Sequence, residues 1–164
     1  MKQTKEIIQS KILDNESMAP VLARLRFRGM KIVFTNGCFD ILHLGHIDYL
    51  SKAKDMGDIL MIGLNTDPSI KKIKGDKRPV QNEESRSLMM ASLHFVDYVI
   101  PFAEETPYNL IKIIQPDVLV KGADYKKKDI AGYDIVEDRG GKIVTVDLLE
   151  GYSTSSIINK IKQS

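Results

Sequence analysis

Short apolar stretches rich in β-branched residues alternate along this chain with segments of helical periodicity. A strand that is apolar on both faces must be covered on both faces, and alternation with helices is how parallel sheets achieve this. The sequence therefore predicts an α/β fold in which helices cover both faces of a parallel sheet. The expected strands are residues 31–35 (KIVFT), 59–65 (ILMIGLN), 96–101 (VDYVIP), 117–122 (DVLVKG) and 142–147 (KIVTVD).

The helices expected between these strands carry recognisable end signals. Asn82 is the expected N-cap of one helix, and Thr106 is the expected N-cap of another, with Pro107 at its first position. Ser153 is expected to open the last helix. The expected helices run from residue 43 or 44 to 56, over 83–93, from 106 to 114, over 130–139 and from 153 to about 162.

Residues 1–30 differ from the alternating region that follows them. Isoleucines form a short helical stripe near the start, and Ser17 is the expected N-cap of a second helix that has Pro20 near its beginning and ends at Gly29. We therefore expect an N-terminal helical extension over residues 1–30, packed on a domain of residues 31–164. A mobile arm is the alternative.

The composition excludes several classes of protein. The 164 residues include 24 Lys and Arg against 22 Asp and Glu, and a net charge of +2 makes no case for nucleic-acid binding. No apolar run approaches the ~20 residues of a membrane span, and the first residues lack the apolar core of a signal peptide. The single cysteine, Cys38, suits a reducing compartment. We expect a cytoplasmic protein that binds neither nucleic acid nor a membrane.

Glycines and polar residues follow the expected strands, at the edge where parallel sheets bind ligands. A glycine turn lets backbone N–H groups approach phosphate oxygens, and helix N-termini attract anions. With basic side chains nearby, this edge suits a phosphate-rich ligand. The residues concerned are Asn36, Gly37, Cys38, Phe39 and Asp40; Asn65, Thr66 and Asp67, then Lys71, Lys72, Lys74, Lys77 and Arg78; Lys121, Gly122, Ala123, Asp124 and Tyr125; and residues 150–156 (EGYSTSS).

Two of the three histidines, His43 and His46, lie three residues apart at the expected start of the first long helix. At this spacing they are expected to project from one face of the first turn, with Gly45 between them letting a ligand pass close to the backbone. The helix dipole disfavours imidazolium there, and a bound polyphosphate would reverse that preference. Two donors aimed at phosphate oxygens would stabilise charge that develops during phosphoryl or nucleotidyl transfer.

Each feature also has a plainer interpretation. The histidine pair alone is equally typical of a surface or capping feature, and without companion ligands it is a weak zinc signal, so no protein-held metal is predicted. A solvated loop is the plainer interpretation of residues 71–77, and a packing role that of Cys38, since no base is adjacent. Their joint placement at strand ends favours the functional interpretation.

The stretch GCFDILHLGH, residues 37–46, resembles the signature of the HxGH nucleotidyltransferases, the cytidylyltransferase-like group of the HIGH superfamily. Ser153 and Thr154, followed by Ile157, complete the pattern, and the resemblance runs from about residue 30 to 162. Within the group the chain is most similar to the adenylyltransferase domain of ADP-heptose synthesis enzymes. The stretches NTDPSIKKIKGDKRPV, TPYNLIKIIQPDVLVKGADY, DIAGYDIVEDRGGKIV and EGYSTSSII carry that similarity. Related fusions have a sugar-kinase domain ahead of this one, and we expect the stand-alone form.

The resemblance implies a doubly wound, five-stranded, Rossmann-like parallel sheet and a defined reaction. ATP and D-glycero-β-D-manno-heptose 1-phosphate would give ADP-heptose and pyrophosphate by in-line attack on the α-phosphorus. The resemblance also implies Mg²⁺ bound through ATP, a homo-oligomer, and a product used for lipopolysaccharide or another surface glycan.

The resemblance also assigns roles to residues. The catalytic residues it implies are His43, His46, Lys72 and Lys74, with Lys71 as a further candidate. The implied nucleotide-binding residues are Asn36, Gly37, Cys38, Phe39, Asp40, Lys121, Gly122, Asp124, Ser153 and Thr154. The residues expected to contact the acceptor are Asn65, Asp67, Arg78 and Tyr125.

Two segments depart from the relatives that use CTP and glycerol 3-phosphate. Those enzymes usually carry Arg-Thr-Glu-Gly where this chain has residues 148–151 (LLEG), and Arg-Tyr-Val-Asp where it has residues 94–97 (HFVD). Both departures favour the heptose branch. A transferase that uses CTP or another phosphorylated alcohol is the first alternative. The second is a nucleotide-binding module without chemistry, against which the retained histidines, lysines and Ser-Thr argue.

Overall fold

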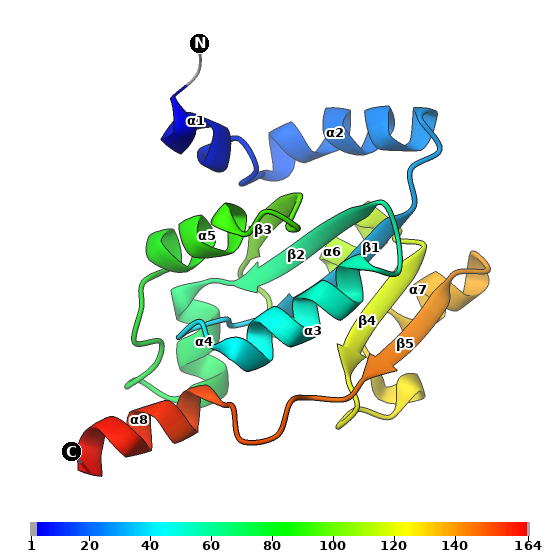
Figure 1. Ribbon diagram of the computed structural model, residues 1–164. Helices are drawn as coiled ribbons and strands as arrows, with labels where there is room; N and C mark the ends of the chain where they lie inside the picture. The colour runs from blue at the N-terminus through cyan, green and yellow to red at the C-terminus, as the bar shows by residue number, and fades with distance from the viewer. Residues whose placement is uncertain (1–2, 164) are drawn as a thin grey trace.

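The computed structural model describes residues 3–163 and confirms the predicted parallel sheet (Figure 1). Its five strands are ordered β3-β2-β1-β4-β5, and every neighbouring pair is parallel. The central strand is β1, which pairs with β2 on one side and with β4 on the other. The later strands therefore lie first on one side of β1 and then on the other. The strands are β1 (Ile32–Gly37), β2 (Ile59–Asn65), β3 (Tyr98–Phe102), β4 (Val118–Gly122) and β5 (Lys142–Val146).

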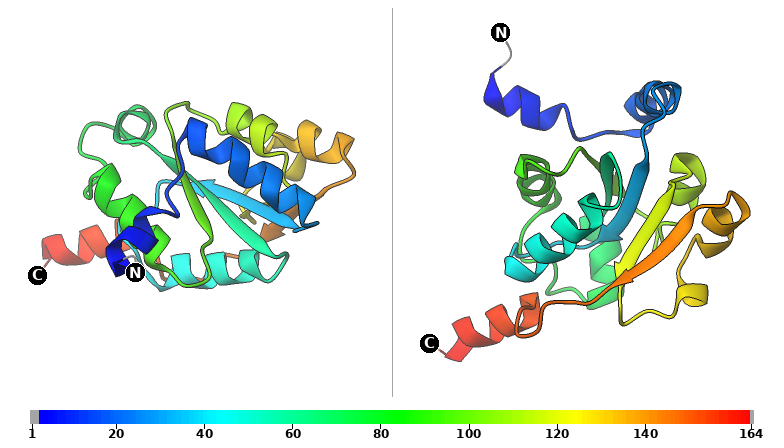
Figure 2. Two further views of the ribbon diagram at one scale, coloured as in Figure 1. Left: turned by 90° about the horizontal axis from the view of Figure 1, so that it is seen from above. Right: turned by 45° about the vertical axis from the view of Figure 1, so that its right-hand side comes forward.

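Helices form a layer on each face of the sheet, and each layer encloses its own apolar core (Figure 2). Neighbouring residues of a strand point to opposite faces, so Val33 joins one core and Phe34 the other. One layer contains α1 (Thr4–Gln9), α3 (Leu44–Lys54) and α5 (Glu83–Ser92). The other contains α2 (Asn15–Phe27), α6 (Tyr108–Ile114) and α7 (Tyr133–Asp138).

The segment before β1 is attached to the sheet by both polar and apolar contacts. Ile12 forms a parallel bridge with Val99, and the Lys11 ammonium donates to two backbone carbonyls near the end of α5. Helix α2 buries three apolar side chains in the core. The predicted N-cap Ser17 is wrong. Asp14 is the N-cap, and it accepts a hydrogen bond from the Ser17 N–H at 2.8 Å while the Ser17 hydroxyl accepts one from the Asp14 N–H at 3.0 Å.

Several other element ends differ from those the sequence predicts. Helix α6 begins at Tyr108 with Pro107 as its N-cap, so Thr106 is not the cap. Helix α7 is shorter than the expected 130–139, because Gly132 lies at φ +84, a left-handed conformation that a helix cannot include. A 3₁₀ turn, η1 (Lys127–Asp129), precedes it. Strand β3 begins two residues later than expected.

Helix α4 (Asp67–Lys74) has no counterpart among the expected helices. It has eight residues, is lysine-rich and buries only Ser69 and Ile70, so a segment this short and polar on average is easily taken for a loop. It follows β2 directly and lies at the carboxyl edge of the sheet (Figure 1). The basic run that resembled a loop is therefore a helix beside the expected ligand site.

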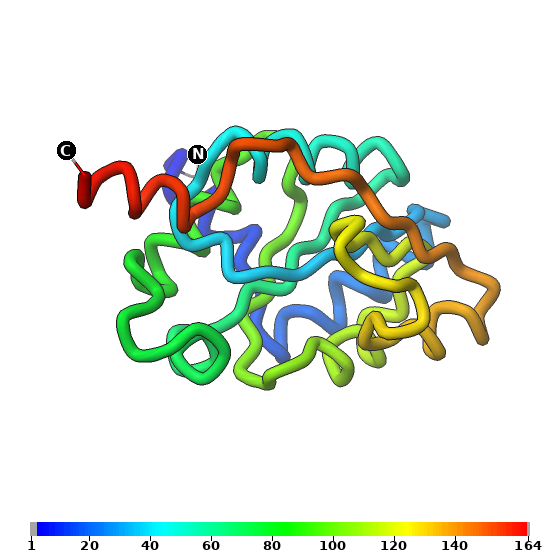
Figure 3. The backbone as a smooth tube through the Cα atoms, turned by 90° about the horizontal axis from the view of Figure 1, so that it is seen from below, coloured from blue at the N-terminus to red at the C-terminus, as the bar shows by residue number. Residues whose placement is uncertain are grey.

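The chain ends in α8 (Thr154–Gln163), which projects away from the sheet over its described length and buries no side chain (Figure 3). The segment between β5 and α8 crosses the carboxyl edge of the sheet beside the start of α3. In the described part of the chain, no helix is long and apolar enough to cross a bilayer.

Two substitutions in α2 test whether the N-terminal segment is an integral part of the fold. Leu22 is 3% exposed and Phe27 is 94% exposed. We expect Leu22→Ala to lower the free energy of unfolding by about 2–4 kcal/mol, because it leaves a cavity in a packed core. Phe27→Ala should change it by less than about 0.5 kcal/mol. Urea denaturation measures both, and equal small effects would support the mobile-arm alternative.

Candidate active site

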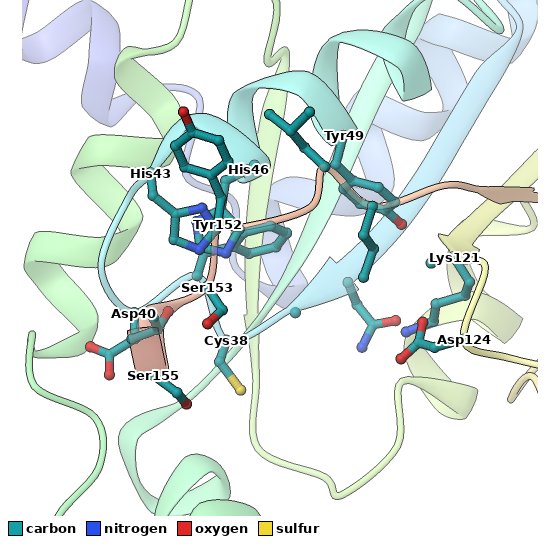
Figure 4. A pocket seen from close by; sticks show the side chains of 18 of the residues that line it. Cys38, Asp40, His43, His46, Tyr49, Lys121, Asp124, Tyr152, Ser153 and Ser155 are labelled. Carbon is teal, nitrogen blue, oxygen red and sulfur yellow. The ribbon is translucent and has the colours of Figure 1, made fainter. Parts of the chain in front are cut away.

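A cavity of about 340 Å³ opens at the carboxyl edge of the sheet, next to β1, where the strand order reverses. Its walls come from the turn after β1, the start of α3, the last residue of α4, the loop after β4 and the segment that leads into α8 (Figure 4). The predicted site residues that line it are Asn36, Gly37, Cys38, Phe39, Asp40, His43, His46, Lys74, Arg78, Lys121, Gly122, Asp124, Tyr125, Ser153 and Thr154.

The two histidines lie face to face in this cavity. His43 is the N-cap residue of α3 with an extended backbone, and His46 belongs to the first turn. Their rings stack with centroids 3.7 Å apart and planes 18° apart. Among the described residues, neither Nδ1 atom has a hydrogen-bond partner, although both are buried. Two adjacent imidazoles with unsatisfied ring nitrogens are suited to bind a ligand rich in hydrogen-bond acceptors or donors.

Both imidazoles are neutral at physiological pH before a ligand binds. Burial lowers the pKa of His46 to about 4, and the Lys74 ammonium, together with His43 whenever that ring is protonated, acts in the same direction. Burial also lowers the pKa of His43. A bound anion would oppose all of these effects and raise both pKa values.

Gly45 lies between two side chains of the site. A Cβ atom there would lie 3.1 Å from the His43 Nδ1 atom and 3.1 Å from the Cβ atom of Tyr152. The absence of a side chain therefore lets the His43 ring and Tyr152 approach the start of α3, where Gly45 also lines the cavity. Tyr152 belongs to residues 150–156, which were expected at the ligand edge, but it was given no role of its own.

A lysine from β4 forms the opposite wall of the cavity. Burial lowers the pKa of Lys121 to about 8, and the nearby Asp124 carboxylate opposes this shift. The Lys121 ammonium also lies 5.4 Å from the centroid of the Tyr125 ring. Figure 4 shows Lys121 and Asp124 across the cavity from the histidines. An anionic ligand would thus meet positive charge on more than one wall.

Asp40 lines the cavity, and its carboxylate is bonded to other parts of the protein. Its carboxylate is 1% exposed, and it accepts hydrogen bonds from Arg78 Nε at 2.7 Å and from the N–H groups of Val80 and Gln81 at 2.9 Å. Burial by itself would raise the pKa of Asp40, but the N–H groups of Gln81 and Val80, together with Arg78, hold it below its ordinary value. Asp40 therefore fixes the loop after α4 against the glycine turn, with Arg78 placed at the cavity.

Three predicted site residues, in addition to the further candidate Lys71, lie outside the cavity lining formed by residues 3–163. Asn65 is buried, and its amide donates to Ser69 Oγ at 3.0 Å. Asp67 accepts hydrogen bonds from Arg86 and from the N–H of Glu83. Lys72 does not line the cavity, whereas Lys74 does. Residues two apart in a helix face different directions, so the two lysines do not point to the same place.

Lys71 and Ser153 differ in their relation to the cavity, since only Ser153 lines it. Lys71 is exposed and is likewise outside the described lining. Ser153 lines the cavity, but its hydroxyl accepts a hydrogen bond from the Ser156 N–H at 3.0 Å and so caps α8. Thr154 and Ser155, at the first turn of α8, also line the cavity.

Two residues near the site were not predicted. Tyr49 lines the cavity from α3, its hydroxyl lies 2.7 Å from Thr35 Oγ1, and burial raises its pKa. Arg86 is fully buried on α5 and donates to the Cys38 carbonyl at 2.7 Å. The sequence does contain a signal for Arg86. This charged residue lies four positions before Met90 and so on the face of α5 that packs toward the sheet.

Comparison with known proteins identifies one matching protein family and several relatives of similar sequence. Residues 34–160 match the family described as cytidylyltransferase-like. The bifunctional protein HldE of Wolinella succinogenes is 50% identical over 156 residues, which cover 95% of this chain and 32% of the relative. HldE of Helicobacter hepaticus is 51% identical over 160 residues, which cover 98% of this chain and 32% of the relative. The chain thus spans about a third of the length of these curated relatives.

Solved structures agree with this placement. The lipopolysaccharide core biosynthesis protein of Thermoplasma volcanium is 32% identical with a TM-score of 0.64, over 74% of this chain and 100% of that one. Pantoate-β-alanine ligase of Francisella tularensis is 20% identical with a TM-score of 0.61, over 93% of this chain and 78% of that one, and shows the shared fold alone. Since the family match covers most of the sheet and every wall of the cavity, the chain belongs to the cytidylyltransferase-like family, as residues 37–46 predict.

Proposed function

We propose that this chain transfers AMP from ATP to D-glycero-β-D-manno-heptose 1-phosphate, forming ADP-heptose and releasing pyrophosphate. The observation that carries the proposal is the stacked pair His43 and His46, set in a cavity with Lys74, Arg78 and Lys121. The four stretches that resemble ADP-heptose adenylyltransferases support heptose as the acceptor. So does the similarity to HldE proteins and to a lipopolysaccharide core biosynthesis protein.

The reaction needs positioning and charge stabilisation more than covalent chemistry. A phosphate oxygen of the sugar phosphate attacks the α-phosphorus of ATP, and a new P–O bond forms. The bond from that phosphorus to the oxygen bridging to the β-phosphorus breaks, and its electron pair leaves with pyrophosphate. Negative charge builds on the departing group, so donors already aimed at it lower the barrier.

The cavity residues divide this work according to their position. His43 and His46 donate N–H groups to the reacting phosphates, and Lys74 acts beside His46, where its charge is already felt. The turn formed by Gly37, Cys38 and Phe39 brings its backbone to the nucleotide. Lys121 and the residues around it form the nucleotide or sugar wall. Thr154 meets phosphate oxygens at the N-terminus of α8.

The donor set fits a Mg²⁺ ion that arrives with ATP. Among residues 3–163, no group of three or more His, Cys, Asp and Glu side chains could hold a metal by itself. Of the carboxylates that line the cavity, Asp40 is already bonded to Arg78 and to backbone, which leaves Asp124 to contact an ion. Mg²⁺ binds readily through phosphates and water with few protein ligands, and when bound it neutralises phosphate charge. Since ATP is an intracellular metabolite, the proposed reaction belongs in the cytoplasm.

Pyrophosphate release with crossed substrates tests the reaction. ATP and CTP would each be paired with heptose 1-phosphate and with glycerol 3-phosphate, in the presence of Mg²⁺. We expect strong turnover with ATP and heptose 1-phosphate alone. Turnover with CTP would assign the chain to the other branch of the family. ATP binding without turnover in any pair would support a nucleotide-binding module.

Histidine substitutions test the mechanism. We expect His43→Ala or His46→Ala to lower kcat by at least about a hundredfold, because each removes a donor that stabilises the transition state. His94→Ala is the matched control, since this third histidine lies outside the described cavity lining and should leave kcat unchanged. Thermal melting would verify that all variants fold, and near-normal kcat in both cavity variants would contradict the mechanism.

The depressed histidine pKa values predict a proton-linked affinity for nucleotide. Since the pKa of His46 is about 4, the ring is neutral at about pH 6 in the free protein, with only one of its two nitrogens protonated. Phosphate oxygens favour imidazolium and raise that pKa, so binding of Mg²⁺-ATP takes up protons and the affinity rises as pH falls from about 8 to about 6. Calorimetry in two buffers of different ionisation enthalpy measures the uptake. His46→Gln should abolish most of it, and proton release in the wild type would contradict the assignment.

A further inference from the structure

Arg86 joins three segments that are distant in the sequence and meet beside the cavity. Its Nη1 donates to the Cys38 carbonyl at 2.7 Å, its Nε to the Gln81 carbonyl at 3.1 Å, and its Nη2 to Asp67 Oδ1 at 2.6 Å. These acceptors belong to the turn after β1, the loop before α5 and the first residue of α4. Because the guanidinium is fully buried, it cannot exchange these partners for water without leaving its place.

Asp67 receives this contact at the N-terminal end of α4. Its second carboxylate oxygen accepts a hydrogen bond from the Glu83 N–H at 3.1 Å, at the start of α5. The same half of α4 is held by Ser69, which donates to the Glu104 carbonyl, and by the fully buried Ile70. From Lys71 to Gly75 every residue is exposed. The described anchoring contacts of α4 are therefore concentrated in its first half.

Lys74 lies at the other end of the same helix. It follows Asp67 by seven residues, and at about 100° per residue this spacing returns to nearly the same side of the helix. Asp67 is thus held by Arg86 on the side of α4 on which Lys74 lines the cavity. Any rotation of the first turn would be passed along the helix to the Lys74 ammonium.

We propose that Arg86 is a positioning residue that acts through Asp67 to align α4, so that Lys74 meets the phosphates bound beside His46. Its bond to the Cys38 carbonyl ties this alignment to the turn that meets the nucleotide. Neither Arg86 nor Asp67 lies in the described cavity lining, so both act through other residues. A lysine at position 86 could not replace the planar fork, because a single ammonium on a flexible stem does not hold three acceptors in fixed directions. This inference rests on the proposed function, which gives Lys74 phosphates to contact.

A double-mutant cycle separates this role from a purely structural one. Asp67→Asn would be made in the wild-type chain and in Lys74→Ala, and the affinity for Mg²⁺-ATP and kcat/KM would be measured for all four proteins. We expect Asp67→Asn to lower both quantities roughly tenfold in the wild-type chain and less than about twofold in Lys74→Ala, because the aligned group is then missing. Arg86→Lys should likewise lower the affinity and kcat/KM in the wild-type chain and have a much smaller effect in Lys74→Ala.

Asp48→Asn is the matched control, since it removes a carboxylate from an exposed ion pair with Lys52 on α3. It should leave affinity and kcat/KM unchanged in both backgrounds. Thermal melting identifies any variant that does not fold. If Arg86→Lys does not fold, Asp67→Asn alone tests the inference, because the Asp67 side chain is 30% exposed. Equal losses in the two backgrounds, or no loss in either, would overturn the inference.

Two further readouts keep this result distinct from the fate of the proposed function. ATP affinity needs no acceptor, so a wild-type chain that binds ATP without turning over heptose 1-phosphate refutes the proposed acceptor and still allows the cycle. Amide hydrogen exchange needs no ligand at all. Asp67→Asn should speed exchange in residues 70–75 while Asp48→Asn should not, and unchanged exchange there would overturn the alignment role.

Discussion

All five strands of the sheet run in the same direction, and this shared direction determines where chemistry can occur. Helices must cover both faces, so the strand interiors are apolar and polar groups are left to the strand ends. Strands β2 and β3 lie on one side of β1, and β4 and β5 lie on the other. The loops that follow β1 and β4 therefore lead away from each other and leave a gap between them. The cavity occupies that gap, with the histidines on one wall and Lys121 on the other.

Two buried charges of opposite sign support this edge without pairing with each other. Asp40 accepts hydrogen bonds from the loop at residues 78–81, and Arg86 donates to the Cys38 carbonyl in the turn after β1. Each satisfies backbone groups that would otherwise be buried without partners, and a buried charge is tolerated when it is bonded in this way. The turn and the loop that line the cavity are thus held in place by these two buried charges.

The sequence predicts the strands, the site edge and most of the cavity lining, because apolar β-branched runs and glycine turns are local signals. It does not predict α4, an eight-residue, lysine-rich helix that buries only Ser69 and Ile70. It assigns Asp67 to a ligand although the structure uses it to bind Arg86. Acidic residues at strand ends are ambiguous for this reason, since whether such a carboxylate faces a ligand or an arginine depends on segments far away in the chain.

The crossing of the segment before α8 over the start of α3 has a consequence for biosynthesis. Tyr152 lies more than a hundred residues after His43, yet the two are brought together at Gly45. A ribosome delivers the glycine turn and both histidines about a hundred residues before Tyr152 and the last wall of the cavity. Contacts between such distant segments are generally slow to form, so a nascent chain holds the histidines long before it holds a complete site.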